Sequence, residues 1–450
     1  MSVTNNLPGK LEEFSSARHQ LGFFCNVGIS ASYAYEGRDL INFKEAIFSA
    51  LSVVIQRHPI LSAIPVDEDS ASPYFARLPE INLEDAVMFL TRQTLYDGYS
   101  QDVELDSVLE KQHNTDFKTN YGTVPFWRLI ILKSPNSEIE FVASFIYHHA
   151  LGDGASGVAF QKHFISAMTS ASAPLRSNII SPPTSPLLPN LELLHPLPIP
   201  PPSPSSTPPT PWTGGHIRLP MKSFFQTLVL PQDITTRFLH TCRAHKTTLT
   251  STLPVLTARV LAHLLPLESP DLKCIIPVNI RRFLPPNSVA DDDMGVWIDA
   301  ISITYHSAEE DAQDSESTWD EARRSRAVIS AYIASDGQRI NVAQMKQRGD
   351  MRKVFLSTVG HERDSSFEVS NLGAVSAGER AREEGGWRMG RCGFSRSAFA
   401  AGGVFSIGAI TGCDGCLCLG FSWQEGVVGE RLMKDVIEGV RKEIEHVVGQ

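Results

Sequence analysis

The spacing of apolar residues along the chain predicts helices at several places. Between positions 41 and 56 the apolar residues recur every three or four positions and so share one helical face: Phe43, Ile47, Ala50, Leu51 and Val54. This helix should end before Pro59, because the residue that precedes a proline disfavours the α-helical backbone. Helices are also predicted over 156–168 and 251–265, and residues 430–448 have the spacing of an amphipathic helix.

Shorter apolar runs that are bounded by turn residues predict strands. They lie at 125–132, 138–147, 272–280, 300–305, 404–410 and 416–423. The first two runs are joined by the turn-rich stretch KSPNS and the last two by TGCDG, so each pair should form a hairpin. Because strands and helices do not alternate strictly, the pattern predicts an α+β fold, a mixed α/β sandwich, rather than a doubly wound parallel sheet.

One proline-rich segment interrupts this pattern. Between Pro174 and Pro211 lie 14 of the 29 prolines, mixed with Ser, Thr and Leu. A proline has no backbone N–H to donate, so the run should be an extended, partly polyproline-II, mobile connector. It divides the chain into an N-terminal subdomain (1–173), a linker (174–211) and a C-terminal subdomain (212–450).

The overall charge argues against two classes of partner. A formal net charge of −10 leaves no cationic footprint for nucleic acid and no polybasic patch for an anionic membrane. No run of about 18 apolar residues could span a bilayer, and the polar N-terminus lacks the apolar core of a secretion signal. The seven cysteines are odd in number and scattered, as expected of reduced thiols. These features predict a soluble protein of the cytoplasm.

The stretch that carries the clearest chemistry is YHHALGDG. A predicted strand delivers His148 and His149 to its end, and Asp153 follows between Gly152 and Gly154. We expect the two glycines to adopt backbone angles closed to other residues, so that the loop folds tightly beneath the imidazole. Neutral histidine is the side chain best suited to accept a proton near neutral pH. The whole string therefore favours a catalytic histidine over a merely structural pair.

The motif HHALGDG resembles the HHxxxDG signature of the chloramphenicol-acetyltransferase-like superfamily. That superfamily includes condensation domains of peptide synthetases, plant BAHD acyltransferases and fungal alcohol acetyltransferases. Six other stretches resemble the alcohol acetyltransferase branch and occur in its order: SSARHQLGFFCNV, RHPIL, VPFWRLII, IIPVNIRR, SNLG and FSRSAFAAGGVFSIG. Together they cover most of the chain outside the linker. The DFGWG signature of the BAHD branch is absent.

The resemblance implies two subdomains of similar topology with an active-site channel between them, which donor and acceptor enter from opposite faces. It also implies a reaction, in which His149 removes the proton of an acceptor hydroxyl and the oxygen attacks the thioester of an acyl-CoA. Acetyl-CoA is the expected donor and a small-molecule alcohol the expected acceptor. An amine acceptor would be served by the same base. The remaining alternative is a catalytically altered member that binds a small molecule or a carrier-bound acyl group.

The resemblance further assigns roles to residues around the base. His148 and Gly154 are expected to support the motif. Asp153 is expected to be structural: it turns away from the substrate and pairs with an arginine. Arg57 is the first choice for that arginine and Arg18 the second, because a buried carboxylate needs a charged or multi-donor partner.

Substrate-binding groups are expected from the second half of the chain. Ser395, Ser397 and Asn371 lie in matching stretches and could donate to the oxyanion that forms during acyl transfer. Arg282 is expected near the channel and the CoA phosphates. The reaction needs no metal and no permanently bound cofactor, and the cysteines of CDGCLC are expected to be buried thiols rather than zinc ligands. The tendency of the family to act alone predicts a monomer.

Overall fold

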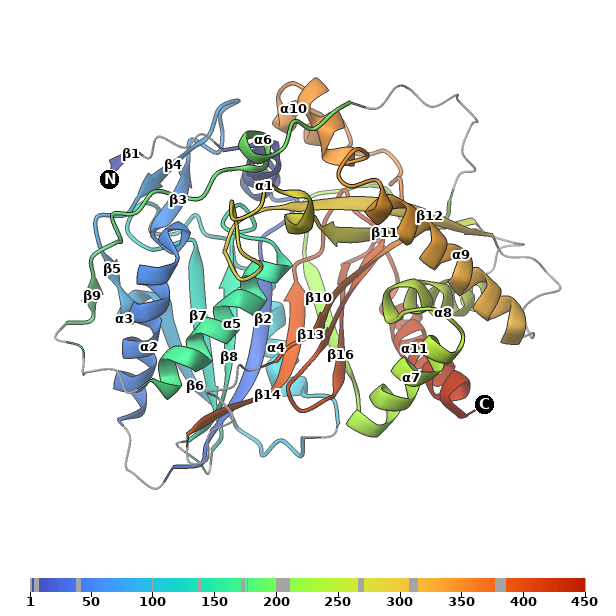
Figure 1. The fold of residues 1–450 in the computed structure, drawn as a ribbon, viewed down its shortest axis with the longest axis horizontal. Coiled ribbons are helices and arrows are strands. Elements are labelled where there is room, and N and C mark those ends of the chain that lie inside the picture. The colour runs from blue at the N-terminus through green and yellow to red at the C-terminus, as the bar shows by residue number, and fades with distance from the viewer. Residues whose placement is uncertain are drawn as a thin grey trace.

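The structure is a computed structural model that describes residues 2–3, 8–37, 42–98, 100–135, 137, 139–170, 175, 177–199, 211–265, 271–306, 315–376 and 386–449. Two β-sheets form the centres of two subdomains that lie side by side (Figure 1). The helices are α1 Lys10–Gln20, α2 Phe43–Arg57, α3 Leu83–Ala86, α4 Val103–His113, α5 Gly154–Thr169, α6 Leu191–Leu194, α7 Gln232–Ala244, α8 Leu249–Leu264, α9 Ser315–Ala334, α10 Met351–Leu356 and α11 Glu430–Gly449.

The N-terminal sheet has five strands in the order β14-β2-β8-β7-β6. They are β2 Val27–Tyr35, β6 Val87–Thr91, β7 Trp127–Lys133, β8 Glu140–Tyr147 and β14 Trp387–Arg396. All neighbours are antiparallel except the pair β6 and β7. Helices α2 and α5 pack together on one face of this sheet (Figure 1). The Phe160 ring of α5 stacks on Phe145 of β8 with a centroid separation of 3.8 Å, so the helix after the motif is fixed to the strand before it.

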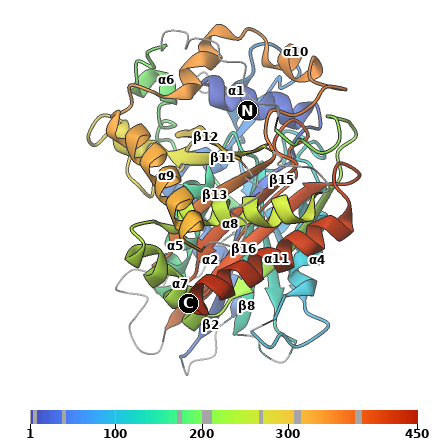
Figure 2. The ribbon, with the colours of Figure 1, turned by 90° about the vertical axis from the view of Figure 1, so that its right-hand side faces the viewer.

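The C-terminal sheet has six strands in the order β10-β16-β15-β13-β11-β12. They are β10 Ser223–Leu230, β11 Asp271–Asn279, β12 Ile298–His306, β13 Phe367–Ala374, β15 Phe405–Thr411 and β16 Leu417–Gln424. Helix α8 packs against α9 and α11, and together with α7 they cover the outer face of the sheet (Figure 2). Their apolar faces and the sheet enclose the second large core of the protein.

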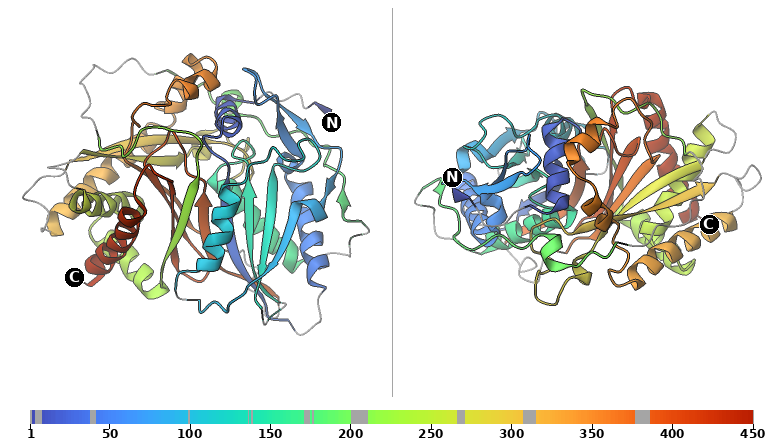
Figure 3. Two further views of the ribbon diagram at one scale, coloured as in Figure 1. Left: turned by 180° about the vertical axis from the view of Figure 1, so that it is seen from behind. Right: turned by 90° about the horizontal axis from the view of Figure 1, so that it is seen from above.

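Two smaller sheets complete the N-terminal subdomain. The first contains β1 Ser2–Val3, β3 Ala63–Val66 and β4 Tyr74–Arg77. The second pairs β5 Ile81–Asn82 with β9 Ile179–Ile180. Seen from above, the two subdomains meet along a boundary at which the dark blue helix α1 lies (Figure 3).

Strand β14 ties the two subdomains together. Although it lies late in the chain, it pairs antiparallel with β2 at the edge of the N-terminal sheet. It also crosses β15 and β16 closely at two paired glycines, Gly408 and Gly420. A Cβ on Gly420 would lie within 2.2 Å of the Phe394 carbonyl oxygen, so only glycine permits this approach. The sequence boundary at 212 therefore does not divide the two sheets cleanly.

The four helices and six strands that the sequence predicted all form, as α2, α5, α8 and α11 and as β7, β8, β11, β12, β15 and β16, but the other elements were not predicted. The helix expected over 41–56 is α2, which ends at Arg57 two residues before Pro59. The two expected hairpins are β7 with β8 and β15 with β16. The α+β class with two subdomains is confirmed. No helix in the described part of the chain is both long and apolar enough to cross a membrane.

Residues 177–199 of the predicted linker connect the two subdomains in a mostly irregular conformation, while 200–210 lie outside the described residues. The described part contains the short elements β9 and α6. Its first half packs on the N-terminal subdomain, and its second half packs mainly against residues of the C-terminal half of the chain, among them Trp297. Leu187, Leu191 and Leu197 are buried, and Arg77 donates to backbone carbonyls of this segment. Apolar leucines among the prolines supply the packing that a proline count alone does not reveal.

Candidate active site

The motif begins where β8 ends and finishes where α5 begins. His148 and His149 follow Tyr147 directly, and the backbone N–H of His148 donates to the carbonyl of Phe126 at 2.9 Å. Asp153 is the N-cap of α5, and its carboxylate accepts from the backbone N–H and hydroxyl of Ser156, both at 3.0 Å. The turn between strand and helix is thus closed at both ends, which holds the imidazole of His149 in place.

The motif glycines are needed for space and not for unusual backbone angles. Neither Gly152 nor Gly154 has a positive φ, so the expectation of a special backbone conformation is wrong. A Cβ on Gly152 would lie 2.6 Å from the Cβ of Ser156, and one on Gly154 would lie 2.7 Å from Leu372. Both positions therefore exclude a side chain because neighbouring atoms already fill the space.

Asp153 pairs with Arg281 rather than with Arg57 or Arg18. The guanidinium Nη1 and Nη2 donate to the two carboxylate oxygens at 2.8 and 3.1 Å, and both side chains are fully buried. The backbone N–H of Trp297 donates to the same carboxylate at 3.1 Å. The pair joins the two subdomains, because Asp153 belongs to the first and Arg281 to the second.

The two arginines that we had expected to fill this role lie elsewhere. Arg57 is exposed and pairs with Asp292 at 3.1 Å. Arg18 is buried beside His149. The stretch IIPVNIRR contained the correct partner, but it presents two adjacent arginines. A turn after β11 directs Arg281 inward and leaves Arg282 exposed, which the sequence did not indicate.

His148 belongs to a closed cluster with Glu68 and His19. The Nε2 of His148 lies 3.0 Å from one carboxylate oxygen of Glu68, and the Nδ1 of His19 lies 2.9 Å from the other. Each ring uses its second nitrogen to accept a backbone N–H, from Ala150 at 3.0 Å and from Phe117 at 3.2 Å. Since those nitrogens accept, the proton of each neutral ring is on the nitrogen that faces Glu68.

This proton arrangement argues against a metal at the cluster, although two histidines and a carboxylate could offer three ligand atoms. A histidine that binds a metal normally donates its other ring N–H to an acceptor. Here the outer nitrogens of His19 and His148 accept instead, so a metal would require both rings to lose their only proton. Despite its burial, which alone would raise it, the pKa of Glu68 is lowered to about 2 by His148 and His19.

His149 differs from His148 in that its ring faces a cavity. Burial, and then the positive charge of Arg18, lower the pKa of His149 well below its ordinary value; contact with its own backbone carbonyl acts in the opposite direction. No hydrogen bond of normal geometry reaches its buried Nδ1 from the described residues. The ring is therefore neutral near pH 7, and its Nε2 edge remains for the cavity.

The cavity has a volume of about 630 Å³ and lies between the subdomains. Its walls come from α1, the start of α5, the strands β11 and β13, and the end of β14. Gly154 and Asn371 line it, as does Phe399. Asn371 donates to Thr250 at 2.9 Å and accepts from Gly373, so its side chain already has protein partners.

The other expected substrate-binding residues occupy different places. Ser397 is buried and its hydroxyl accepts the backbone N–H groups of Cys25 and Asn26 at 2.9 and 3.3 Å, so it has a structural role. The Ser395 hydroxyl donates to the carbonyl of Gly28 at 3.4 Å and faces a neighbouring cavity. Arg282 is exposed and does not line the cavity of His149.

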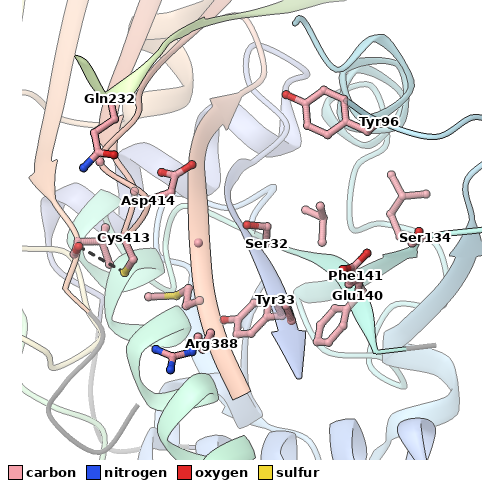
Figure 4. A pocket seen from close by; sticks show the side chains of 18 of the residues that line it. Ser32, Tyr33, Tyr96, Ser134, Glu140, Phe141, Gln232, Arg388, Cys413 and Asp414 are labelled. Carbon is pink, nitrogen blue, oxygen red and sulfur yellow. Dashed lines mark hydrogen bonds between the residues drawn. The ribbon is translucent and has the colours of Figure 1, made fainter. Parts of the chain in front are cut away.

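Two further cavities continue along β14. Figure 4 shows one of them, of about 1010 Å³, lined by residues that include Tyr33 of β2 and Arg388 of β14. A smaller cavity of about 280 Å³ shares Tyr96 and Asp414 with it. The small cavity and the cavity of His149 are both lined by Phe394. The three cavities thus adjoin in a row along β14.

This arrangement defines the chain as an acyltransferase of the two-subdomain, HHxxxDG type. Among solved structures it resembles TRI3 trichothecene 15-O-acetyltransferase from Fusarium sporotrichioides, with a TM-score of 0.70 and 12% identity over 98% of this chain and 94% of that one. It also resembles the first condensation domain of the calcium-dependent antibiotic synthetase, with a TM-score of 0.64 and 12% identity over 99% and 97% of the two chains.

The sequence comparison identifies the family. The chain belongs to the alcohol acetyltransferase family, which it matches over residues 8–184 and 230–442. It is 41% identical to "Probable alcohol acetyltransferase crmB" of Aspergillus fumigatus, over 97% of this chain and 98% of that protein. It is 22% identical to "Probable alcohol acetyltransferase FCK4" of Fusarium pseudograminearum, over 97% and 93%. The expected family membership and the enzyme class are therefore confirmed.

Proposed function

We propose that this protein transfers an acyl group, with acetyl the expected one, from acyl-CoA to a hydroxyl of a small-molecule acceptor, and that His149 is the general base. The observation that carries the proposal is the setting of His149. Its ring is neutral, fixed by a tight turn and open to a cavity between the subdomains. A neutral imidazole that is held in one position can accept a proton from a bound hydroxyl.

The proposed reaction proceeds in two balanced steps. The acceptor hydroxyl gives its proton to His149 while its oxygen forms a bond to the thioester carbon, and the carbonyl electrons move to oxygen. The resulting tetrahedral oxyanion then reforms the carbonyl and breaks the carbon–sulfur bond. The leaving CoA thiolate takes the proton from the imidazolium, which returns His149 to its neutral form. General-base action of this kind contributes about 10²–10⁴-fold in rate.

The remaining residues of the motif would act through position. The pair of Asp153 and Arg281 fixes the loop and joins the subdomains, and His148 is anchored by Glu68. The cavities that adjoin along β14 offer space for the two substrates next to His149. In this proposal the donor and the acceptor approach the base from opposite faces.

The test is release of free thiol from acetyl-CoA in the presence of alcohols and amines, together with the mass of the product. We expect release that depends on an alcohol, a product heavier by one acetyl group, and loss of both in His149→Ala. His240→Ala is the matched control, because His240 is exposed on α7. Transfer only to amines would reassign the acceptor. No release with any acceptor, from folded protein, would favour a carrier-bound donor or a binding role.

A further inference from the structure

Arg18 is a buried cation in the last turn of α1, and aromatic rings fix its position. Only 7% of the residue is exposed. The guanidinium carbon lies 4.1 Å from the centroid of the Phe24 ring, 5.0 Å from that of Phe14 and 5.3 Å from that of Phe399. A cation held against aromatic faces is stabilised in place without using its hydrogen-bond donors. The guanidinium is therefore positioned, but its N–H groups are largely unused.

Within the described part of the chain, no carboxylate pairs with Arg18. Its one hydrogen bond is a long one, 3.5 Å, to the hydroxyl of Ser15, and its buried Nε makes none. The carboxylate of Glu368 is bound on both oxygens by Arg396. Burial and then the charge of Arg396 lower the pKa of Arg18 to about 9, and the charge of Glu368 only partly offsets them.

The other buried arginines at or near the cavities are matched. Arg281 is paired with Asp153 and Arg92 with Asp102. A buried charge costs free energy unless an opposite charge or several hydrogen bonds compensate it. Among the described residues, Arg18 is the buried arginine of the His149 cavity that has neither a paired carboxylate nor several hydrogen bonds. An anion that enters the cavity would supply the opposite charge.

Arg18 also lies beside the reacting position. It lines the same cavity as His149, and Phe24 contacts both side chains: its ring centroid lies 5.8 Å from that of the imidazole. A negatively charged oxygen near the imidazole would therefore be within the field of the guanidinium. An arginine presents five N–H donors in a planar fork, which suits an oxyanion or a carboxylate.

We propose that Arg18 is the anion-binding residue of the His149 cavity and binds a negatively charged oxygen next to the base. This inference rests on the proposed function for the origin of that oxygen. One source is the oxyanion of the tetrahedral intermediate, which would make Arg18 a catalytic residue. The other source is a carboxylate on the acceptor, which would make it a specificity-determining residue. The chemistry that Arg18 recognises is the same in both cases.

Anion binding is tested first without any turnover, by thermal unfolding of the whole protein with increasing sodium butyrate. Sodium chloride and methyl butyrate serve as controls for ionic strength and for apolar binding. We expect a saturable rise in Tm with butyrate for the wild type, and none for Arg18→Met. Arg348→Met is the matched control, because Arg348 lines the same cavity but is exposed; it should keep the response. An equal response in Arg18→Met, or none in the wild type, would overturn the proposal.

A milder variant covers the case in which Arg18→Met does not fold. Arg18→Lys keeps the positive charge and the apolar stem but loses the planar fork. We expect it to bind butyrate more weakly than the wild type by at least about fivefold. If it binds butyrate as tightly as the wild type, planar recognition by Arg18 is excluded.

Kinetics then separate the two sources of the anion, once the wild type transfers acetyl to an alcohol. If Arg18 stabilises the oxyanion, kcat with a neutral alcohol falls about 10²–10³-fold in Arg18→Met with little change in KM. If it binds an acceptor carboxylate, kcat with neutral alcohols is retained and only acidic acceptors lose kcat/KM.

A wild type without transfer would count against the proposed function, while the butyrate titration would still decide the role of Arg18. Full activity of Arg18→Met on both kinds of acceptor would contradict the proposal.

Discussion

The two adjacent histidines of the motif sit in opposite chemical surroundings. Around His148 the charges are matched: its Nε2 lies 3.0 Å from the Glu68 carboxylate, the other Glu68 oxygen lies 2.9 Å from the Nδ1 of His19, and backbone N–H groups donate to the remaining ring nitrogens. Around His149 the imidazole and the buried Arg18 lack matching partners among the described residues and face a cavity. We infer that the matched cluster stabilises the fold, whereas the unmatched pair is arranged for a ligand.

The largest effect on the fold should come from breaking the link between the subdomains. Arg281→Met leaves the buried carboxylate of Asp153 without its charged partner, which typically costs about 3–5 kcal/mol of unfolding free energy. Arg57→Met breaks a pair of similar length that is exposed, and should cost less than about 1 kcal/mol. Urea denaturation of both variants measures the difference. Similar costs for the two would show that burial of the motif aspartate does not matter.

The next effect concerns the matched cluster. Glu68→Gln removes a negative charge that lies within 3.0 Å of nitrogens of two buried imidazole rings and should cost about 1.5–3 kcal/mol of unfolding free energy at pH 7. Turnover per folded molecule should fall by less than about tenfold, because the base itself is not in the cluster. Denaturation midpoints and the kcat of the folded fraction test this. A loss of turnover without a loss of stability would reverse the roles given to the two histidines.

The same cluster predicts a pH dependence. The pKa of His148 is lowered to about 4 by burial and then by His19, so between pH 6.5 and 4 the unfolded chain binds a proton that the folded chain does not. Stability should therefore fall as pH decreases through that window. The pKa of Glu68 is lowered to about 2, so its contribution is present above pH 4.5 and is lost toward pH 2. The stability advantage of the wild type over Glu68→Gln should accordingly shrink below pH 4.5.

The smallest effects should distinguish the two serines near the end of β14. Ser397→Ala leaves two buried backbone N–H groups without an acceptor and should cost about 1–3 kcal/mol of unfolding free energy. Ser395→Ala removes one long hydrogen bond and should cost less than about 1 kcal/mol. Neither should lower kcat as strongly as His149→Ala. If Ser397→Ala lowers kcat a hundredfold while the fold stays intact, its hydroxyl acts on the substrate.

The sequence predicted the class of fold and the reactive position because both depend on local patterns. Apolar periodicity marked α2, the hairpins and α11, and the HHxxxDG string marked His149. It missed partners that only the tertiary fold brings together. Nothing near Glu68 in the sequence indicates that its carboxylate meets His19 and His148. The choice of Arg281 over its neighbour depends on one turn of backbone.

The same limit applies to two features of the chain path. The pairing of β14 with β2 joins residues more than 350 positions apart, and no local pattern encodes which sheet an edge strand joins. The linker prediction relied on prolines and did not consider the leucines that pack 177–199 against both halves of the chain. In both cases the outcome was decided by burial against distant residues.

The most direct test of the account measures turnover and thermal unfolding on the same preparations of His149→Ala and Glu68→Gln. We predict that His149→Ala loses about 10²–10⁴-fold in kcat for acetyl transfer while its Tm changes little. We predict the reverse for Glu68→Gln, a lower Tm with most of the kcat per folded molecule retained. Wild-type kcat in folded His149→Ala would contradict the account, because the neutral histidine at the cavity would then not be the base.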